Sequence, residues 1–182
     1  WNMECYTILA KEKKDYKLCS NISSDNGKNY CYRKIGKLTK DTSACNLASE
    51  KDACMLEVGS VQNNISTCSL IGNNSLRIVC FAKIGSTTND TRFCNMIGDE
   101  KAVYQYDLYN KDWCYRMVAE HLLNVSLCSA INDEGQHAIC LWGIAYRTKQ
   151  TAVCDMIGNM VGHIGSSIYD KNSCYRATNS RQ

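Results

Sequence analysis

Hydrophobic residues recur along the chain at helical spacing, always in the same relation to a cysteine. After Cys31 come the aromatic Tyr32, the aliphatic Ile35 and the small Gly36, and residues of the same kinds follow the cysteines at 5, 54, 80, 114 and 140. Apolar positions three and four residues apart lie on one face of a helix. Each segment therefore predicts a helix with an apolar face, and the small residue lets a neighbouring helix approach closely.

A second pattern surrounds the remaining cysteines. Four residues before each of them stands a polar residue, and three residues after it stands an apolar one, as with Asp41 and Ala48 around Cys45. Five of the six polar residues are good helix N-caps, because their side-chain oxygen can accept from free amides of the first turn. A helix is therefore predicted to begin at each of Asp15, Asp41, Asn64, Asp90, Asn124 and Gln150.

The two patterns alternate, which predicts a chain of helical hairpins. One helix begins at the cap, a loop of variable length follows, and a second helix carries the next cysteine. The predicted fold is all-α: a single right-handed αα-hairpin solenoid over 1–182, built from about six disulfide-stapled repeats. A lone helix at 2–13 precedes the hairpins, which are predicted at 15–40, 41–63, 64–89, 90–123, 124–149 and 150–182.

The spacing of the thirteen cysteines supports this repeat. Every second gap is 14 residues long, whereas the gaps between them vary from 9 to 20. The constant gap is interpreted as the connection between hairpins and the variable gap as the hairpin tip. The chain has no C-x-x-C motif, and His121, His137 and His163 match no repeat position. Disulfides are therefore predicted instead of a metal site, which implies an oxidising compartment or a hyperthermophile interior.

Two registers could pair the cysteines. An antiparallel hairpin brings together residues equidistant from its tip, which favours Cys19–Cys31, Cys45–Cys54, Cys68–Cys80, Cys94–Cys114, Cys128–Cys140 and Cys154–Cys174. Cys5 is then left unpaired, or free to bridge to another chain. The alternative register pairs Cys5–Cys19, Cys31–Cys45 and so on, and has the attraction of a constant span of 14 residues. It would offset the two sulfurs by about a helical turn.

Composition limits the cellular compartments and the classes of partner that are expected for this protein. The chain has 182 residues, a net charge of +3 and no apolar run long enough for a transmembrane helix. The charge is too small and too dispersed for nucleic-acid binding. We interpret the chain, which begins with Trp1, as a processed, exported protein located outside the cell or at its surface. Five N-x-S/T sequons could then carry N-glycans: Asn21, Asn64, Asn73, Asn89 and Asn124.

Aromatic residues cluster near the longer tips. Tyr104, Tyr106 and Tyr109 lie within the gap between Cys94 and Cys114. They could form a contact surface for a partner or a glycan, but packing along lengthened helices is the favoured interpretation. Trp113 and Trp142 are expected to have core roles.

No catalytic residues and no cofactor are predicted. The nearest approach to an acid–base pair is Glu120 with His121, and adjacent residues on a helix do not face each other. The repeat accounts for almost every distinctive residue, so the chain is not expected to be an enzyme.

The repeat resembles cysteine-rich helical-hairpin repeats of exported archaeal proteins. The resemblance rests on Asp41-Thr-Ser-Ala-Cys45-Asn-Leu-Ala, on Asp52-Ala-Cys54 and on Asp112-Trp-Cys114-Tyr-Arg-Met-Val-Ala119. The architecture is similar to tetratricopeptide and Sel1-like α-solenoids, although their Trp/Leu/Gly/Tyr/Pro motifs are absent. The resemblance implies binding or scaffolding and no defined activity, because fold analogy alone does not give function.

The sequence leaves two functions open. The hairpins have no polar capping repeats, so the ends could stack head to tail into a filament or surface layer, with Cys5 at the junction. An extracellular structural protein of this kind is the first expectation. The alternative is a monomeric secreted module that binds a protein or a glycan on its concave face. Polar end helices would favour the module.

Overall fold

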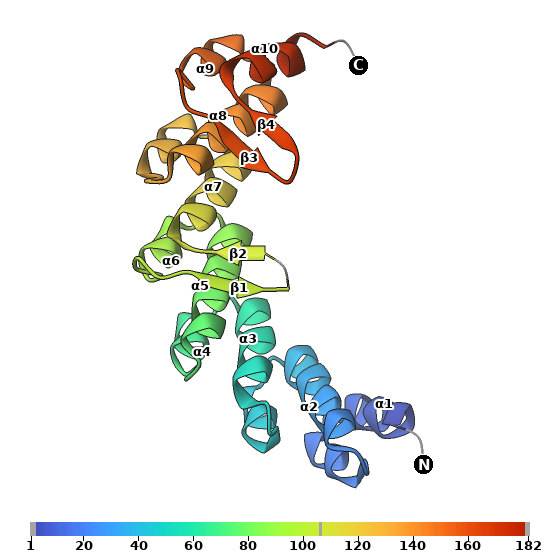
Figure 1. The fold of residues 1–182 in the computed structure, drawn as a ribbon. Coiled ribbons are helices and arrows are strands. Elements are labelled where there is room, and N and C mark those ends of the chain that lie inside the picture. Colours follow the sequence, from blue (N-terminus) through green and yellow to red (C-terminus); the bar gives the residue numbers. More distant parts are fainter. Residues whose placement is uncertain (1–2, 106, 181–182) are drawn as a thin grey trace. The chain divides into compact units, whose positions relative to one another are not determined.

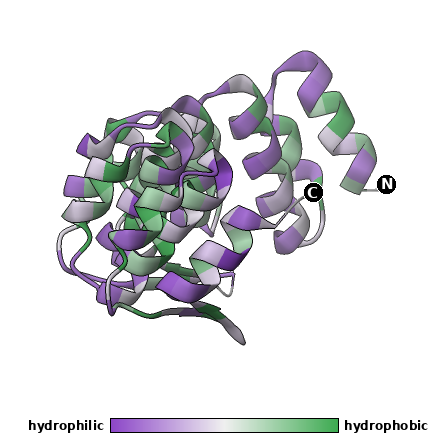
Figure 2. Ribbon diagram, turned by 90° about the horizontal axis from the view of Figure 1, so that it is seen from above, coloured by the Kyte–Doolittle hydropathy of each residue, from purple (hydrophilic) through white to green (hydrophobic). Residues whose placement is uncertain are grey.

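The computed structural model describes residues 3–105 and 107–180, and this part of the chain is mostly helical (Figure 1). It contains ten α-helices, three 3-10 helices and two small antiparallel sheets within the described residues. The chain forms two compact units, residues 1–84 and 85–182, with the boundary inside one helix. Along the helices the ribbon alternates between hydrophobic and hydrophilic residues (Figure 2), as expected for elements with one buried face.

The first unit consists of helices alone. Its elements are α1 (Met3–Lys13), η1 (Tyr16–Asn21), α2 (Asp25–Thr39), η2 (Thr42–Leu47), α3 (Lys51–Gln62), α4 (Ile65–Ser69) and the first part of α5 (Asn74–Thr88). Long helices alternate with single turns. Each single turn carries one cysteine and the next long helix carries its partner.

The second unit adds two short β-hairpins to the same plan. After the end of α5 come α6 (Thr91–Asn95), β1 (Ala102–Tyr104), β2 (Asp107–Tyr109), α7 (Lys111–Leu122), η3 (Val125–Ala130), α8 (Glu134–Thr148), α9 (Thr151–Asp155), β3 (Gly162–Ile164), β4 (Ser167–Tyr169) and α10 (Lys171–Asn179). Val103 lies opposite Leu108 in the first hairpin, and His163 lies opposite Ile168 in the second.

The predicted N-caps are confirmed at five of six positions. The side-chain oxygen of each Asp or Asn cap accepts from the backbone N–H two residues later, at 2.8 Å in Asp41 and at 3.0 Å in Asp15 and Asn124. Asn64 and Asp90 make the same bond at 2.9 Å. Gln150 makes no such bond. Its side chain is one methylene longer, which places its oxygen poorly for the nearby amide.

The capped helices are shorter than the hairpin prediction implies. Each is a single turn of five or six residues, and three of the six are 3-10 helices. The apolar residue three positions after the cysteine ends the turn and does not continue a helix. Ile22, Ile71 and Ile157 at this position are 3%, 0% and 0% exposed. Burial of this side chain, together with the disulfide, holds a turn too short to be stable alone.

One residue in the left-handed region joins each long helix to the next cap. Six of these have φ between 52° and 57°: Lys14, Lys40, Asn63, Asn89, Leu123 and Lys149. Where the residue is Lys40, Asn63 or Leu123, its N–H donates to the carbonyl of the small residue four positions earlier. The connection is therefore always two residues long, which accounts for the constant gap between cysteines.

The small residue of each long helix lies where the following hairpin packs against it. A β-carbon on Gly59 would lie 3.1 Å from Sγ of Cys80, and one on Gly85 would lie 2.7 Å from Sγ of Cys114. The close approach predicted from the sequence is therefore present. At these two positions the neighbour is the disulfide of the next repeat, whereas a β-carbon on Gly36 would lie 3.0 Å from Cγ2 of Val58.

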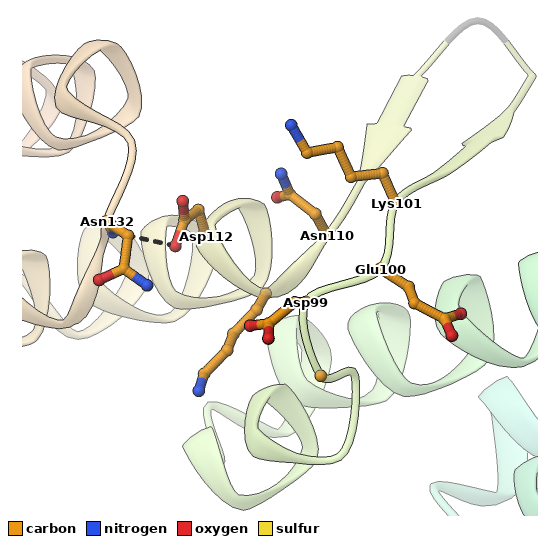
Figure 3. A pocket seen from close by; sticks show the side chains of 8 residues that line it. Asp99, Glu100, Lys101, Asn110, Asp112 and Asn132 are labelled. Carbon is orange, nitrogen blue, oxygen red and sulfur yellow. Dashed lines mark hydrogen bonds between the residues drawn. The ribbon is translucent and has the colours of Figure 1, made fainter.

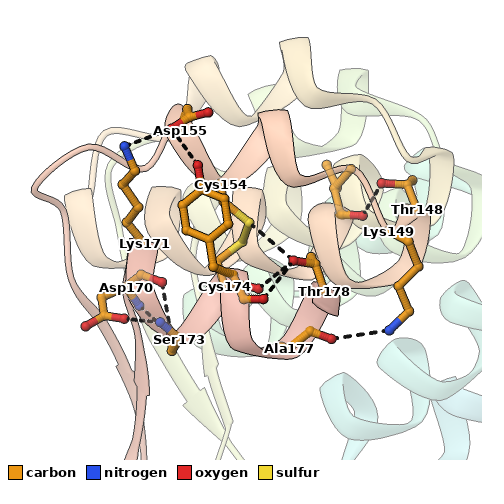
Figure 4. Close-up of a disulfide and its surroundings, with 12 residues drawn as sticks. Thr148, Lys149, Cys154, Asp155, Asp170, Lys171, Ser173, Cys174, Ala177 and Thr178 are labelled. Carbon is orange, nitrogen blue, oxygen red and sulfur yellow. Dashed lines mark hydrogen bonds and ion pairs between the residues drawn. A yellow bond between two sulfur atoms is a disulfide. The ribbon is translucent and has the colours of Figure 1, made fainter. Parts of the chain in front are cut away.

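Six disulfides lie in the core of the two units. The pairs are Cys19–Cys31, Cys45–Cys54, Cys68–Cys80, Cys94–Cys114, Cys128–Cys140 and Cys154–Cys174, with Cα–Cα distances of 5.3 to 5.8 Å. They match the hairpin-tip register. All twelve cysteines are 0% or 1% exposed. Around the last pair, Thr178 lies 4.0 Å from Sγ of Cys154 and bonds back along α10 (Figure 4).

The expectation of lengthened helices in the two longest tips is wrong. Both 20-residue gaps contain a two-stranded hairpin, so the chain is mostly helical and not all-α. β-Branched and aromatic residues such as Val103, Tyr104 and Ile168 favour strands, and Gln105 and Gly165 supply the positive φ that tight hairpin turns need.

The aromatic residues near these tips pack beside the hairpins. Tyr109 is 5% exposed, and its ring centroid lies 4.7 Å from that of Trp113. Trp113 and Trp142 are half-buried and border the core, in contrast to the core role expected for them. Tyr104 is half-buried on β1, and Tyr106 lies outside the described residues.

Candidate ligand-binding site

Three hollows in the described surface have distinct chemistry. A groove of about 530 Å³ on the first unit combines exposed apolar residues such as Ile8 and Leu38 with Lys11, Lys34 and Lys37. A polar pocket of about 180 Å³ surrounds Asp112. The third is a cleft of about 260 Å³ on the second unit, here named the Trp142 cleft and lined by Arg116, Glu120, Ile139, Trp142, Gly143, Tyr146, Arg147, Ile164 and Tyr169.

The polar pocket has little unused binding capacity. The Asp112 carboxylate already accepts from the backbone N–H groups of Asn132 at 3.1 Å and Asp133 at 2.9 Å. In Figure 3 the Glu100 side chain points away from Asp112. Among the described residues no group of three or more His, Cys, Asp or Glu side chains could hold a metal ion. We therefore assign this pocket a structural role.

Three elements of the second unit build the Trp142 cleft. Arg116 and Glu120 lie one turn apart on α7, and Trp142 and Tyr146 lie one turn apart on α8. Residues four apart on a helix share a face, so each helix presents its pair in the same direction. The β3–β4 hairpin completes the cleft with Ile164 and Tyr169.

A largely buried ion cluster forms one wall of the Trp142 cleft. The Glu120 carboxylate lies 3.3 Å from a terminal nitrogen of Arg116 and 3.8 Å from one of Arg147. The Glu120 and Arg116 side chains are only 13% and 14% exposed. Burial raises the pKa of Glu120, and the two guanidinium groups oppose this only in part. The cluster thus contains two guanidinium cations and only one carboxyl group, which is largely buried.

Two hydrogen-bond donors of this cleft have no partner. Nε of Arg116 and Nε1 of Trp142 are both shielded from solvent, and neither donates a hydrogen bond to any described residue. Leaving a buried donor unsatisfied costs about 1–3 kcal/mol. Such groups call for an explanation in a native structure. Both residues line the cleft, but Nε of Arg33, at the repeat position of Arg116 in the first unit, is buried and unpartnered as well, so only Nε1 of Trp142 distinguishes the cleft.

Aromatic rings form the opposite wall. Trp142 and Tyr146 are stacked with centroids 5.3 Å apart and an interplanar angle of 16°, and Tyr169 meets Trp142 edge-on at 5.1 Å. The Lys149 ammonium lies 4.5 Å from the centroid of Tyr146, which is 41% exposed. The cleft therefore combines accessible aromatic surface, cationic groups and a carboxyl group, which is the composition of a small-molecule site.

A glycine on α8 leaves room for this cleft. In the first unit Arg33, the second residue after Cys31, lies 3.6 Å from Glu57, the third residue after Cys54. At the same two repeat positions the second unit has Arg116 and Gly143. A β-carbon on Gly143 would lie 3.0 Å from Cδ of Glu120. Glycine in place of glutamate therefore leaves the room that Glu120 and the cleft occupy.

Sequence reasoning missed this site. The sequence pairs Glu120 only with His121, which is exposed, and that these two do not act together stays a prediction. The sequence pattern also assigns Trp142 a core role, whereas Trp142 lines the cleft. The available signal is Gly143, a glycine inside a predicted helix beside Trp142. The sequence predicts apolar faces on α7 and α8, but these faces do not indicate that the β3–β4 hairpin packs over them. The wall of the cleft that this hairpin forms could therefore not be predicted.

The other predicted site residues are placed as follows. Cys5 is exposed and unpaired in the described part of the chain. The sequon asparagines at 21, 64, 73 and 124 are exposed, whereas Asn89 is half-buried with its Oδ1 shielded. Asn64 and Asn124 use Oδ1 as caps, which leaves Nδ2 available for a glycan. Glycosylation and an intermolecular bond at Cys5 stay predictions.

None of the helices in the described residues has the length and apolarity required to span a membrane. No protein-family model matches the chain, and no curated protein or solved structure is detectably similar to it.

Proposed function

We propose that this protein is an exported, disulfide-stapled helical-repeat module that binds a small polar ligand in the Trp142 cleft. The observation that carries the proposal is Nε1 of Trp142, a buried donor without a partner among the described residues, beside the exposed ring of Tyr146. Nε of Arg116 is unpartnered too, but so is Nε of Arg33 at the same repeat position in the first unit, so this group does not by itself indicate a ligand. For Trp142, an acceptor atom of a bound ligand supplies the hydrogen-bond partner that the protein itself does not provide.

Export and a solenoid arrangement form part of the same proposal. Six buried disulfides favour an oxidising compartment such as the extracellular space. The regular alternation of capped turns and long helices supports a solenoid of repeats, each packing on its neighbours.

The first and last helices of the described residues expose different kinds of side chain. The solvent-facing residues of α10 are polar, as in Asn172, Arg176 and Asn179, whereas α1 exposes Met3 at 39% and Ile8 at 56%. A stacking interface between copies would bury an apolar surface. The filament expectation stays a prediction, and sedimentation of the disulfide-intact protein at high concentration tests it. A single monomeric species supports the module, and concentration-dependent polymers contradict it.

The test of ligand binding uses the indole N–H signals of the three tryptophans in a ¹H–¹⁵N correlation spectrum. Trp142→Phe identifies the Trp142 signal, and Trp113, which lies outside the cleft, is the internal reference. Mixtures of monosaccharides, amino acids and dipeptides are added to the full, oxidised chain. We expect saturable shifts of the Trp142 signal with the Trp113 signal unchanged. If no compound moves the Trp142 signal selectively, the proposal is wrong.

A further inference from the structure

We infer that the ligand of the Trp142 cleft is an acidic sugar, a pyranose ring that carries a carboxylate. The inference rests on the proposed function and specifies the ligand class at the same site. Three properties of the cleft lead to it: its unbalanced positive charge, its accessible aromatic rings and its unmet hydrogen-bond capacity.

The charge of the cleft calls for an anion. Its lining contains the guanidinium groups of Arg116 and Arg147 and the single carboxyl group of Glu120. Lys149 adds an ammonium at the edge, over Tyr146. Arg147 is 53% exposed; its Nη1 donates to the Glu120 backbone carbonyl at 3.1 Å and its Nη2 lies 3.8 Å from the Glu120 carboxylate, which leaves its other N–H groups for a second carboxylate. Guanidinium groups bind carboxylates through two parallel hydrogen bonds, which a neutral ligand cannot exploit.

The aromatic wall calls for a flat, partly apolar ligand. A pyranose ring has C–H groups on its faces and hydroxyl groups around its edge. The C–H groups carry partial positive charge and suit the electron-rich face of an aromatic ring. Tyr146 is 41% exposed, and Tyr169 and Trp142 are half-buried. A small inorganic anion or an acyclic carboxylate would leave this surface unused.

The remaining polar groups match the edge of a sugar. Glu120 can accept from ligand hydroxyl groups, the exposed Arg147 can donate to ligand oxygens, and Nε1 of Trp142 lacks an acceptor within the described part of the fold. The cleft volume of about 260 Å³ lies just below the roughly 300–1,000 Å³ range of ordinary ligand pockets. One ring fits this space, which points to a free acidic monosaccharide or one residue of a longer chain.

The experiment compares four probes, which separate the effect of the ligand's negative charge on affinity from the effect of its ring. Glucuronate and galacturonate have both features, glucose has the ring without the carboxylate, and gluconate has the carboxylate without the ring. Each is titrated against the oxidised full-length chain while the Trp142 indole signal is followed. We expect at least one of the two uronates to bind about tenfold or more tightly than both glucose and gluconate, a difference of about 1.4 kcal/mol or more.

Two variants assign the effect to the cleft. Arg147→Gln should remove most of the preference for the uronate over glucose, because it deletes the accessible guanidinium. Arg92→Gln is the matched control: it changes an 86% exposed arginine of the same unit that lies outside the cleft lining, and it should keep that preference. Circular dichroism of both variants shows whether the fold is retained.

The outcomes distinguish this inference from the proposed function. Equal affinity for glucose and both uronates would overturn the acidic specificity, and equal affinity for gluconate would overturn the ring requirement. Selective shifts of Trp142 by amino acids or dipeptides alone would overturn the sugar assignment and leave the binding function intact. A folded Arg147→Gln variant with an unchanged preference would also refute the inference.

Discussion

The Asp52 carboxylate accepts a hydrogen bond at 2.7 Å from the backbone N–H of Asn73, which lies at the start of the next hairpin's long helix. Its other oxygen accepts from the N–H of Gly72 at 3.1 Å. Asp112 accepts in the same way from the N–H of Asn132 (Figure 3) and from that of Asp133. Both aspartates stand two residues before a bridged cysteine. The repeat thus contains a polar connection between hairpins that no apolar pattern reveals.

Asp52→Ala should therefore destabilise the protein. Two hydrogen bonds to a charged acceptor are lost, and we expect the free energy of unfolding to fall by about 1–3 kcal/mol. Urea denaturation of the oxidised protein measures the change. Asp25→Ala is the control, because Asp25 is 84% exposed and forms only a surface ion pair with Lys28. Equal effects of the two substitutions would contradict the structural role of Asp52.

Leu123→Asn should stabilise the protein. Leu123 has φ of 53°, a left-handed conformation that costs an ordinary residue roughly 1–2 kcal/mol and that asparagine adopts more readily. Asn63 and Asn89 already occupy this position in other repeats. Leu123 is 45% exposed, so little packing is lost. We expect a gain of up to about 1 kcal/mol in thermal or urea unfolding. A loss of stability would show that the Leu123 side chain contributes more than its backbone strain costs.

Gly143→Ala should impair ligand binding without unfolding the protein. The new β-carbon would lie 3.0 Å from Cδ of Glu120, so the end of this flexible side chain must move within the cleft. Alanine favours the helix by about 1 kcal/mol, which offsets the crowding. We expect weaker shifts of the Trp142 indole signal and a near-unchanged melting temperature. In the control Gly72→Ala, the nearest atom lies 3.4 Å away on Asp52 and binding should persist.

The stability contribution of Glu120 should increase as the pH falls. Burial raises the pKa of Glu120 above its ordinary value of 4.5, so the folded protein binds this proton more tightly than the unfolded chain does. The resulting stability is fully present below pH 4.5 and is lost as the pH rises through the folded-state pKa. Relative to Glu120→Gln, the wild type should therefore gain stability as the pH falls through the folded-state pKa of Glu120. Urea denaturation at several pH values measures this difference, and the opposite slope would contradict it.

Removing a disulfide should lower the free energy of unfolding by a larger amount when that disulfide closes a longer loop. The chain-entropy relation predicts that the 20-residue span of Cys154–Cys174 contributes about 0.7 kcal/mol more than the 9-residue span of Cys45–Cys54. Paired Cys→Ala variants of each bridge, compared by urea unfolding, test this. A larger loss from the shorter loop would mean that local packing and not chain entropy dominates.

The amino-acid sequence determined the elements that depend on local chemistry. Asp and Asn caps, small residues on the long helices and the alternating cysteine gaps are each read from neighbouring positions, and the corresponding caps, close approaches and cysteine pairs are present in the structure. Local hydrogen bonding and helix periodicity act over a few residues, so the sequence carries them directly. The two hairpins in the longest gaps were missed because alternation over three residues per strand is too short a signal.

Only the tertiary structure decided the candidate site. Arg116 and Glu120 come from α7, Trp142 from α8, and Tyr169 from β4. Sequence spacing pairs the first two on one helix, but it does not show that β4 closes over α8 or that Arg116 and Trp142 are left with unpartnered donors. Burial of a polar group depends on every element packed around it. The repeat therefore follows from local patterns, whereas the cleft follows from how α7, α8 and the β3–β4 hairpin pack against one another.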